Sequence, residues 1–305
     1  MLIQNEFDIQ FQLPCETAMI VLLHLHPSLQ QQLRSSEDLQ VEHVDSNTTR
    51  NITPTGYTDC FGNRCARFTA PAGALRISGR SLVEAPDQQD TQAFQAVQHP
   101  VADLPHQVLQ FLLSSRYCEV DRFNGIASDL FGYSLPGWPL ATAIRDWVHG
   151  KVRFDYMKAR STKTAMDVYT EREGVCRDFQ HLAVTLTRAM NIPARYVTGY
   201  LGDIRLPFGG PGDFSAWYQV YLGGQWWNID ARHNEPRYGR LLMATGRDAA
   251  DVAITTSFGV ANLTHFQVES YEVTPEGGRV PLLAPSPAPS PASSSAPSQS
   301  STVLP

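Results

Sequence analysis

The chain has 305 residues, of which 42% are apolar, so it is long enough to bury a large core and to divide into two domains. Its formal net charge is −6, and acidic and basic residues are mixed without a basic run, which argues against nucleic acid or an anionic membrane as a partner. The sequence contains no stretch of roughly 18 or more apolar residues, which argues against a membrane span.

Residues 1–83 have the pattern of β-strands. In the segment FDIQFQL, apolar residues alternate with polar ones, which is the period of a strand with one buried face. The apolar runs farther along are separated by turn residues such as Gly62 and Pro71. We therefore predict a β-rich N-terminal domain over residues 1–83.

The next part of the chain has the spacing of helices. Apolar residues recur every three or four positions in residues 104–117 and 139–155, and Pro105 and Pro139 are placed as helix starters. A further short helix is expected to end at Gly174.

Composition sets the remaining boundaries. We assign residues 84–280 to a second domain. Residues 281–305 consist mostly of Pro, Ser and Ala and are expected to be disordered, because they cannot bury enough apolar surface to fold. The N-terminus has no basic start followed by an unbroken apolar stretch, and the five cysteines are scattered, so a cytoplasmic location is expected.

The stretch GVCRDFQHLAVTLTRAMNIPARYVTGYL places a cysteine in the first turn of a predicted helix. Cys176 lies at the edge of the apolar face, where unpaired backbone N–H groups and the positive end of the helix dipole favour a thiolate. The same N–H groups can hold a developing oxyanion. A buried, unreactive cysteine is the alternative interpretation. His181 faces away from Cys176 on the helix, so we reject it as the base and interpret it as a surface or packing residue.

The segment FSAWYQVYLGGQWWNIDAR predicts a β-hairpin around a Gly-Gly turn. A symmetric turn places Ser215, Trp217 and Asp230 on one face, with Ser215 and Asp230 as diagonal neighbours. A histidine at position 215 would meet Asp230 as a base meets its orienting carboxylate, but the sequence has serine there. Trp217 is the aromatic residue expected to line a substrate pocket, with packing in the core as the alternative.

These motifs together resemble the transglutaminase-like superfamily of papain-related cysteine enzymes. The resemblance runs from roughly residue 164 to 234 and rests on GVC, the helix after it, NIPARYVTGY, the Ala-Trp pair and WNIDAR, in this order. It is closest to bacterial transglutaminase-like proteins with a β-rich N-terminal region. The resemblance implies an α+β fold in which the helix carrying the cysteine packs on an antiparallel sheet. By the family's order, Cys176 is the nucleophile, Asp230 is the carboxylate and Ser215 occupies the histidine position.

The serine leaves three hypotheses open, because its hydroxyl cannot act as a base near neutral pH. In the first, His233 replaces the histidine, since Asn234 and Pro236 indicate that the strand has ended and a loop histidine can fold back. In the second, the helix terminus alone sets up the thiolate and an unidentified group assists. In the third, the site is catalytically inactive, and the protein is a binding or scaffold module.

The resemblance implies acyl transfer or amide hydrolysis through a thioester on Cys176, with a glutamine side chain or a peptide bond of a protein or peptide as the substrate. Neither a metal nor another cofactor is expected, because the sequence has no phosphate-binding glycine loop, no HExxH and no nucleotide fingerprint. The sequence does not determine the acyl acceptor, amine or water, or the oligomeric state.

Overall fold

The computed structural model describes residues 1–45, 48–206 and 212–282. Its strands are β1 (Leu2–Leu13), β2 (Thr17–Val21), β3 (Asp38–Val44), β4 (Thr49–Asn51), β5 (Thr55–Thr58), β6 (Arg64–Ala70), β7 (Gly73–Glu84), β8 (Arg153–Phe154), β9 (Glu173–Gly174), β10 (Ala194–Tyr200), β11 (Phe214–Leu222), β12 (Gln225–Ile229), β13 (Leu241–Gly246), β14 (Thr255–Ser257) and β15 (Asn262–Val273). The α-helices are α1 (His106–Leu109), α2 (Asn124–Phe131), α3 (Trp138–Lys151), α4 (Ala165–Glu171) and α5 (Cys176–Ala189). Short 3-10 helices lie at Pro27–Gln32, Val101–Asp103, Gln110–Leu112, Val120–Arg122 and Tyr156–Lys158.

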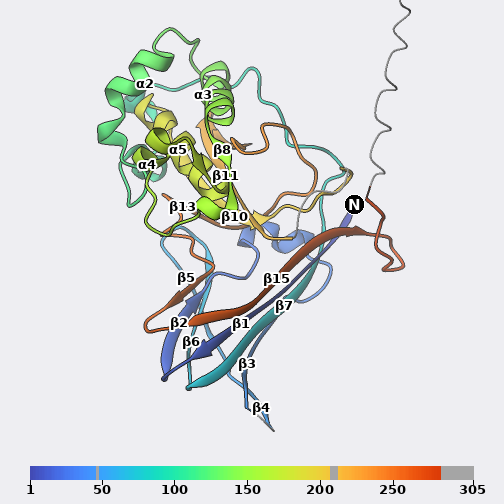
Figure 1. Cartoon of the computed structure of the whole chain (residues 1–305). Helices are drawn as coiled ribbons and strands as arrows, with labels where there is room; N and C mark the ends of the chain where they lie inside the picture. Colours follow the sequence, from blue (N-terminus) through green and yellow to red (C-terminus); the bar gives the residue numbers. More distant parts are fainter. Residues whose placement is uncertain (46–47, 207–211, 283–305) are drawn as a thin grey trace, which may run out of the picture.

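Two antiparallel sheets form the β-rich part of the molecule. Their strand orders are β15-β1-β7-β3-β4 and β14-β2-β6-β5, and they share one apolar core (Figure 1). Along β1, Phe7, Ile9 and Phe11 are buried whereas Asp8 and Gln10 are partly exposed, so the alternation in the sequence corresponds to one buried face. The predicted β-rich N-terminal region is confirmed.

The C-terminal strands complete these N-terminal sheets. β15 pairs with β1 over almost the whole length of both strands, and β14 pairs with β2. Without β15, β1 would be a long edge strand with unpaired N–H and C=O groups. The division into domains of residues 1–83 and 84–280 stays a prediction, because β14 and β15 lie in the second range but belong to the sheets of the first. Residues 283–305 of the predicted tail lie outside the described residues.

A separate antiparallel sheet, β12-β11-β10-β13, carries the helical part. α5 packs on β10 and β11, and α2, α3 and α4 also pack against α5 (Figure 1). The predicted α+β class, with the cysteine helix on an antiparallel sheet, is therefore confirmed. In the part of the chain that the structure describes, no helix is long and apolar enough to cross a membrane.

The helix predicted over residues 104–117 is mostly absent. Only α1 and one 3-10 turn form, and the chain is irregular from Leu113 to Tyr117. The backbone N–H of Tyr117 donates instead to Asp248 Oδ2 at 2.8 Å, and the Phe111 ring packs edge-on against Trp226. Contacts with distant parts of the chain thus override the helical spacing.

The hairpin forms with the predicted register near its turn. Leu222 lies opposite Gln225, and both turn glycines adopt positive φ, 60° at Gly223 and 86° at Gly224, which suits a tight hairpin turn. The β11–β12 pairing ends at Ile229, so Asp230 does not pair with β11 as the predicted hairpin required. The chain turns there instead, and the N–H of Asn234 donates to the Asp230 carbonyl at 3.0 Å.

Aromatic contacts fix the start of β11 to the N-terminal core. The Phe214 ring lies 6.1 Å from Phe7 of β1 and 5.3 Å from Tyr200 of β10, measured between ring centroids. Because Phe214 directly precedes Ser215, the N-terminal sheet sets the position of the strand on which the family histidine is expected.

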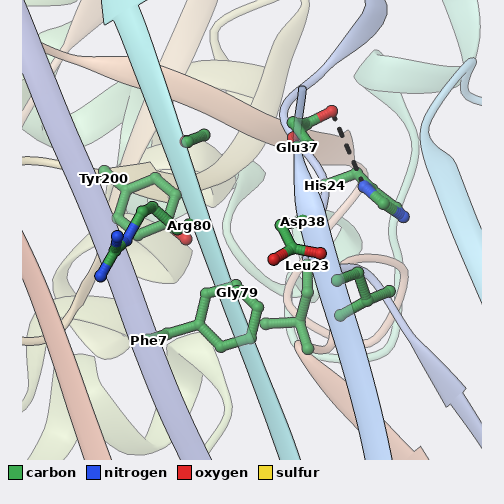
Figure 2. A pocket seen from close by; sticks show the side chains of 10 residues that line it. Phe7, Leu23, His24, Glu37, Asp38, Gly79, Arg80 and Tyr200 are labelled. Atoms are coloured by element: carbon green, nitrogen blue, oxygen red, sulfur yellow. Dashed lines mark ion pairs between the residues drawn. The ribbon is translucent and has the colours of Figure 1, made fainter. Parts of the chain in front are cut away.

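A cavity of about 10 Å³ lies beside this aromatic cluster, as Figure 2 shows. Gly79 leaves the space that the Phe7 ring fills, since a Cβ at this glycine would lie 2.5 Å from the ring. Tyr200 lies on the other side, and Glu37 forms an ion pair with His24 at the cavity wall. A cavity this small is a packing defect and does not accommodate a substrate.

Ile77 tests the N-terminal core. It is fully buried and lies opposite Ile9 on one neighbouring strand and Val41 on the other. Ile77→Ala should lower the free energy of unfolding by about 2–5 kcal/mol, because it leaves a cavity in the core. Chemical denaturation measures the loss. Arg80→Ala, an exposed position on the same strand, should change the stability by less than about 1 kcal/mol, and equal losses for the two variants would contradict the assigned core.

Candidate active site

Cys176 is the first residue of α5 and follows the short strand β9. The side chain is half-buried and packs against the apolar cluster that contains Tyr196 and Ala216. Asp178 caps the helix, because its Oδ2 accepts from the N–H of Val175 at 3.0 Å. A Cβ at Gly174 would lie 2.6 Å from that oxygen, so the glycine makes room for the cap. The GVC sequence is therefore a structural requirement of the helix start as well as a carrier of the thiol.

Opposing effects act on the pKa of the Cys176 thiol. Burial raises the pKa of Cys176 to about 11, although the positive charge of Arg232 and the backbone N–H of Arg177 both lower it. The sequence predicted that the helix terminus would favour a thiolate. Desolvation of the sulfur opposes the field of the helix end, and the thiolate stays a prediction. Reaction at Cys176 therefore requires a group that accepts the thiol proton.

Asp230 is buried at the end of β12 and accepts five hydrogen bonds. The donors are Gln180 Nε2 (3.0 Å), Arg240 Nη2 (2.9 Å), the N–H groups of Arg232 (2.9 Å) and His233 (3.2 Å), and His233 Nδ1 (2.8 Å). Burial alone would raise the pKa of this carboxyl, but Arg240 and His233 hold it well below its usual range. Asp230 is therefore a fixed carboxylate that orients the groups around it.

His233 lies in the turn that follows Asp230. This is the position required by the hypothesis that His233 replaces the family histidine. Its Nδ1 bonds to Asp230 Oδ2 at 2.8 Å, so in the neutral ring Nδ1 carries the proton and Nε2 is left as an acceptor. The side chain is 21% exposed and thus reachable from solvent. Among the described residues no hydrogen bond joins His233 to Cys176. The structure joins the carboxylate and the histidine by a hydrogen bond, and among the described residues the thiol is bonded to neither.

Ser215 and Trp217, the other two predicted site residues, have different surroundings. Ser215 is buried in β11 opposite Gly199, and within residues 1–45, 48–206 and 212–282 its hydroxyl has no hydrogen-bond partner. Trp217 is only 1% exposed, which leaves almost no ring surface for a substrate. Its Nε1 donates to Asn228, and the Arg240 guanidinium lies over its ring at 5.2 Å. Trp217 therefore packs in the core beside Arg240, which was the alternative to lining a substrate pocket.

The sequence analysis did not identify Gln180 and Arg240. Gln180 Nε2 donates to the Ala216 carbonyl at 3.2 Å as well as to Asp230, and so ties α5 to the hairpin. It lies one helical turn after Cys176, so helical periodicity contained a signal for it. Arg240 bridges Asp230 and Asp90 with its buried guanidinium, and no local pattern marks a contact between such distant residues.

His181 is completely buried, so of the two interpretations, surface or packing residue, the structure shows packing. Its ring stacks on Tyr117 with centroids 4.9 Å apart, and Nε2 accepts from the N–H of Ala249 at 3.1 Å. The polar face of α5 is thus covered by other parts of the chain. The Nε2 atom of His181 accepts from a backbone N–H and is therefore not free to take the thiol proton.

Arg240→Met tests the network around Asp230. The variant should lower the free energy of unfolding by about 3–5 kcal/mol, because it leaves the carboxylate buried without its main counter-charge. Since the folded pKa of Asp230 is depressed, its contribution is present above the unfolded pKa of about 3.9 and is lost as the pH falls further. The difference between variant and wild type should therefore shrink below about pH 4.

Denaturant titration across this pH range measures both effects. Arg122→Met is the control, because Arg122 forms an exposed ion pair with Glu119 and its removal should cost less than about 1 kcal/mol. A loss at Arg240 no greater than that of the control would contradict a buried, charged Asp230.

Comparisons with known proteins identify the family of the chain. A model of the transglutaminase-like superfamily matches residues 133–231. An uncharacterized protein of Mycobacterium leprae is 36% identical over 210 residues, which cover 65% of this chain and 73% of the relative. An uncharacterized protein of Mycobacterium tuberculosis is 31% identical over 134 residues, or 39% of this chain and 42% of that one.

A solved structure extends the similarity to most of the chain. It is a Cytophaga hutchinsonii protein described as a candidate cysteine protease, with a TM-score of 0.78 and 33% identity, covering 88% of this chain and 90% of that one. This coverage includes the N-terminal sheets as well as the helical part. The chain belongs to the transglutaminase-like superfamily.

Proposed function

We propose that this protein is a cysteine-dependent enzyme that hydrolyses or transfers the acyl group of an amide through a thioester on Cys176. The observation that carries the proposal is the hydrogen-bonded pair of Asp230 and His233. This pair supplies an oriented base although serine stands at position 215. The substrate is a glutamine side chain or a peptide bond of a protein or peptide, and the acceptor is water or an amine.

The steps follow from the protonation states. His233 Nε2 accepts the thiol proton as Cys176 Sγ attacks the amide carbonyl carbon, and the resulting oxyanion faces the N–H of Cys176 at the start of α5. The tetrahedral intermediate collapses, the C–N bond breaks and the histidine returns the proton to the leaving amine. Water or an amine then attacks the thioester, its proton passes to His233, and the thiol is regenerated.

The lack of a hydrogen bond between His233 and Cys176 among the described residues is compatible with this role. Catalytic hydrogen bonds are often long before substrate binds and shorten in the complex. His233 lies in a turn, where a small rotation of the side chain about its bond to Asp230 moves Nε2. The charge of Arg232 assists, because it stabilises the thiolate that forms as the proton leaves.

The five free cysteines support a reducing compartment, and we propose that the protein acts in the cytoplasm. Cys65 and Cys118 are buried, so their thiols belong to the core.

Acylation by an activated ester or by a glutamine-containing peptide tests the activity. Cys176→Ala should abolish the covalent intermediate seen by mass spectrometry, and His233→Ala should lower kcat/KM by about 10²–10⁴-fold. Ser215→Ala should retain activity, because the proposed base lies elsewhere. Failure to detect any Cys176-dependent acylation, in protein whose folding is verified by thermal melting, would favour the non-catalytic scaffold.

The pH dependence of alkylation tests the state of the thiol. In a Cys15→Ser, Cys60→Ser background, the rate of Cys176 alkylation by iodoacetamide should rise about tenfold per pH unit between about pH 7 and 10, because burial raises the pKa of the thiol to about 11. The modified peptide identified by mass spectrometry measures the rate. A plateau already reached at pH 7 would show instead a stable thiolate in the protein without substrate.

A further inference from the structure

Arg232 is a charged side chain that forms no ion pair with any of the described residues, and it lies in the turn between Asp230 and His233. Its backbone is held at both ends, because its N–H donates to Asp230 at 2.9 Å and its carbonyl accepts from His149 Nδ1 at 3.0 Å. Its guanidinium lies over the Phe154 ring at 4.2 Å. Within residues 1–45, 48–206 and 212–282 the guanidinium makes no hydrogen bond and no ion pair.

Its position places this charge next to the sulfur. Phe154 pairs with Gly174 in the two-stranded β8–β9 sheet, and Gly174 is two residues before Cys176. The guanidinium over Phe154 is thus at the start of α5. The electrostatic effect on the thiol agrees with this position, because among nearby charges Arg232 does most to lower the pKa of Cys176 against the effect of burial.

The other arginines around the thiol are neutralised. Arg177 pairs with Asp178, and Arg153 pairs with Glu173. Burial raises the pKa of the Asp213 carboxyl and the nearby positive charge of Arg232 lowers it, but among the described residues the two side chains form no ion pair. A half-buried guanidinium with free N–H groups is therefore available at the site, and the planar group that it matches best is a carboxylate.

An apolar surface adjoins the guanidinium. Tyr156 packs edge-on against Phe154 and is 54% exposed, and the neighbouring Met157 is 88% exposed. Exposed apolar side chains next to a reactive group are typical of a surface that holds a ligand chain. Arg232 and this surface lie together near the start of α5, where Cys176 is located, and we refer to them as the rim.

We propose that Arg232 is a specificity-determining residue that binds a carboxylate of the substrate next to the amide under attack. The proposal rests on the proposed function of Cys176 and names its substrate class as acyl donors with a carboxylate beside the scissile amide, on a neighbouring side chain or at a chain end. The aromatic surface around Phe154 contacts the rest of the donor.

Two alkylating reagents of the same shape test the subsite without requiring turnover. Iodoacetate carries a carboxylate and iodoacetamide carries a neutral amide, and both alkylate the same sulfur. A change in the pKa of the thiol alters both rates equally, so it cancels in the ratio of the two rate constants. The ratio at Cys176, measured by mass spectrometry in a Cys60→Ser background, is compared with the ratio at the exposed Cys15.

The iodoacetate-to-iodoacetamide ratio at Cys176 should exceed that at Cys15 by about five- to tenfold, because the reagent's carboxylate pairs with the guanidinium. Arg232→Gln should bring it down to the value at Cys15, and Arg232→Lys should keep most of the preference. Arg153→Gln is the matched control, because Arg153 is an exposed arginine of the same rim that is already paired. Its ratio should equal that of the wild type.

An unchanged ratio in Arg232→Gln, or an equal fall in Arg153→Gln, would overturn the proposal. Thermal melting verifies folding, which the variant should retain because the side chain makes no hydrogen bond. A second experiment compares two peptide amides that carry either Glu or Gln beside the scissile bond. In Arg232→Gln, KM should rise at least about tenfold for the Glu peptide and stay unchanged for the Gln peptide. Absence of turnover on every amide would contradict the proposed function and leave the alkylation ratio to decide the carboxylate subsite.

Discussion

The buried carboxylate of Asp230 is the constraint on which the arrangement of the site depends. A charge at this depth is stable only when donors surround it, and five hydrogen bonds converge on its two oxygens. Gln180 ties it to the cysteine helix, and Arg240 connects it to Asp90 before the helical part begins. The turn that carries His233 is folded by the same oxygens. The position of the candidate base is therefore a consequence of satisfying this charge.

Direct contacts connect the N-terminal sheets to the strand that carries Ser215. β15 returns from the end of the described chain to pair with β1, and the segments on either side of residues 203–211 run against its backbone. A Cβ at Gly202 or at Gly212 would lie 2.0 Å or 1.9 Å from a carbonyl oxygen of β15, so both positions need glycine for this approach. Together with the packing of Phe214 on Phe7, these contacts fix the N-terminal end of β11, which is the end opposite the hairpin turn. Changes in the β-rich region are thus expected to reach the site through β11.

Much of this arrangement could be predicted from local patterns. The alternation in β1, the helix that begins at Cys176 and the register beside the Gly223-Gly224 turn all depend on residues close in sequence. The turn after Asp230 was predicted from Asn234 and Pro236; the strand ends at Ile229, and Asn234 in the turn has φ 58°. The prediction of a helix over residues 104–117 was wrong, and the sequence analysis did not predict that the polar face of α5 is buried. In both cases the deciding partners, Asp248 and Tyr117, are far from the misread segment in sequence.

The sequence by itself determined the family, the residue that carries the thiol, and the departure at Ser215, because these are matters of residue type and short-range spacing. Only the tertiary structure decided the electrostatics of the site. A helix terminus favours a thiolate, but the packing around Cys176 desolvates the sulfur and raises its pKa. Likewise Asp230 becomes a permanent charge only because Arg240 is folded against it. Charge states depend on burial and on long-range partners, and neither quantity is encoded in a local window of sequence.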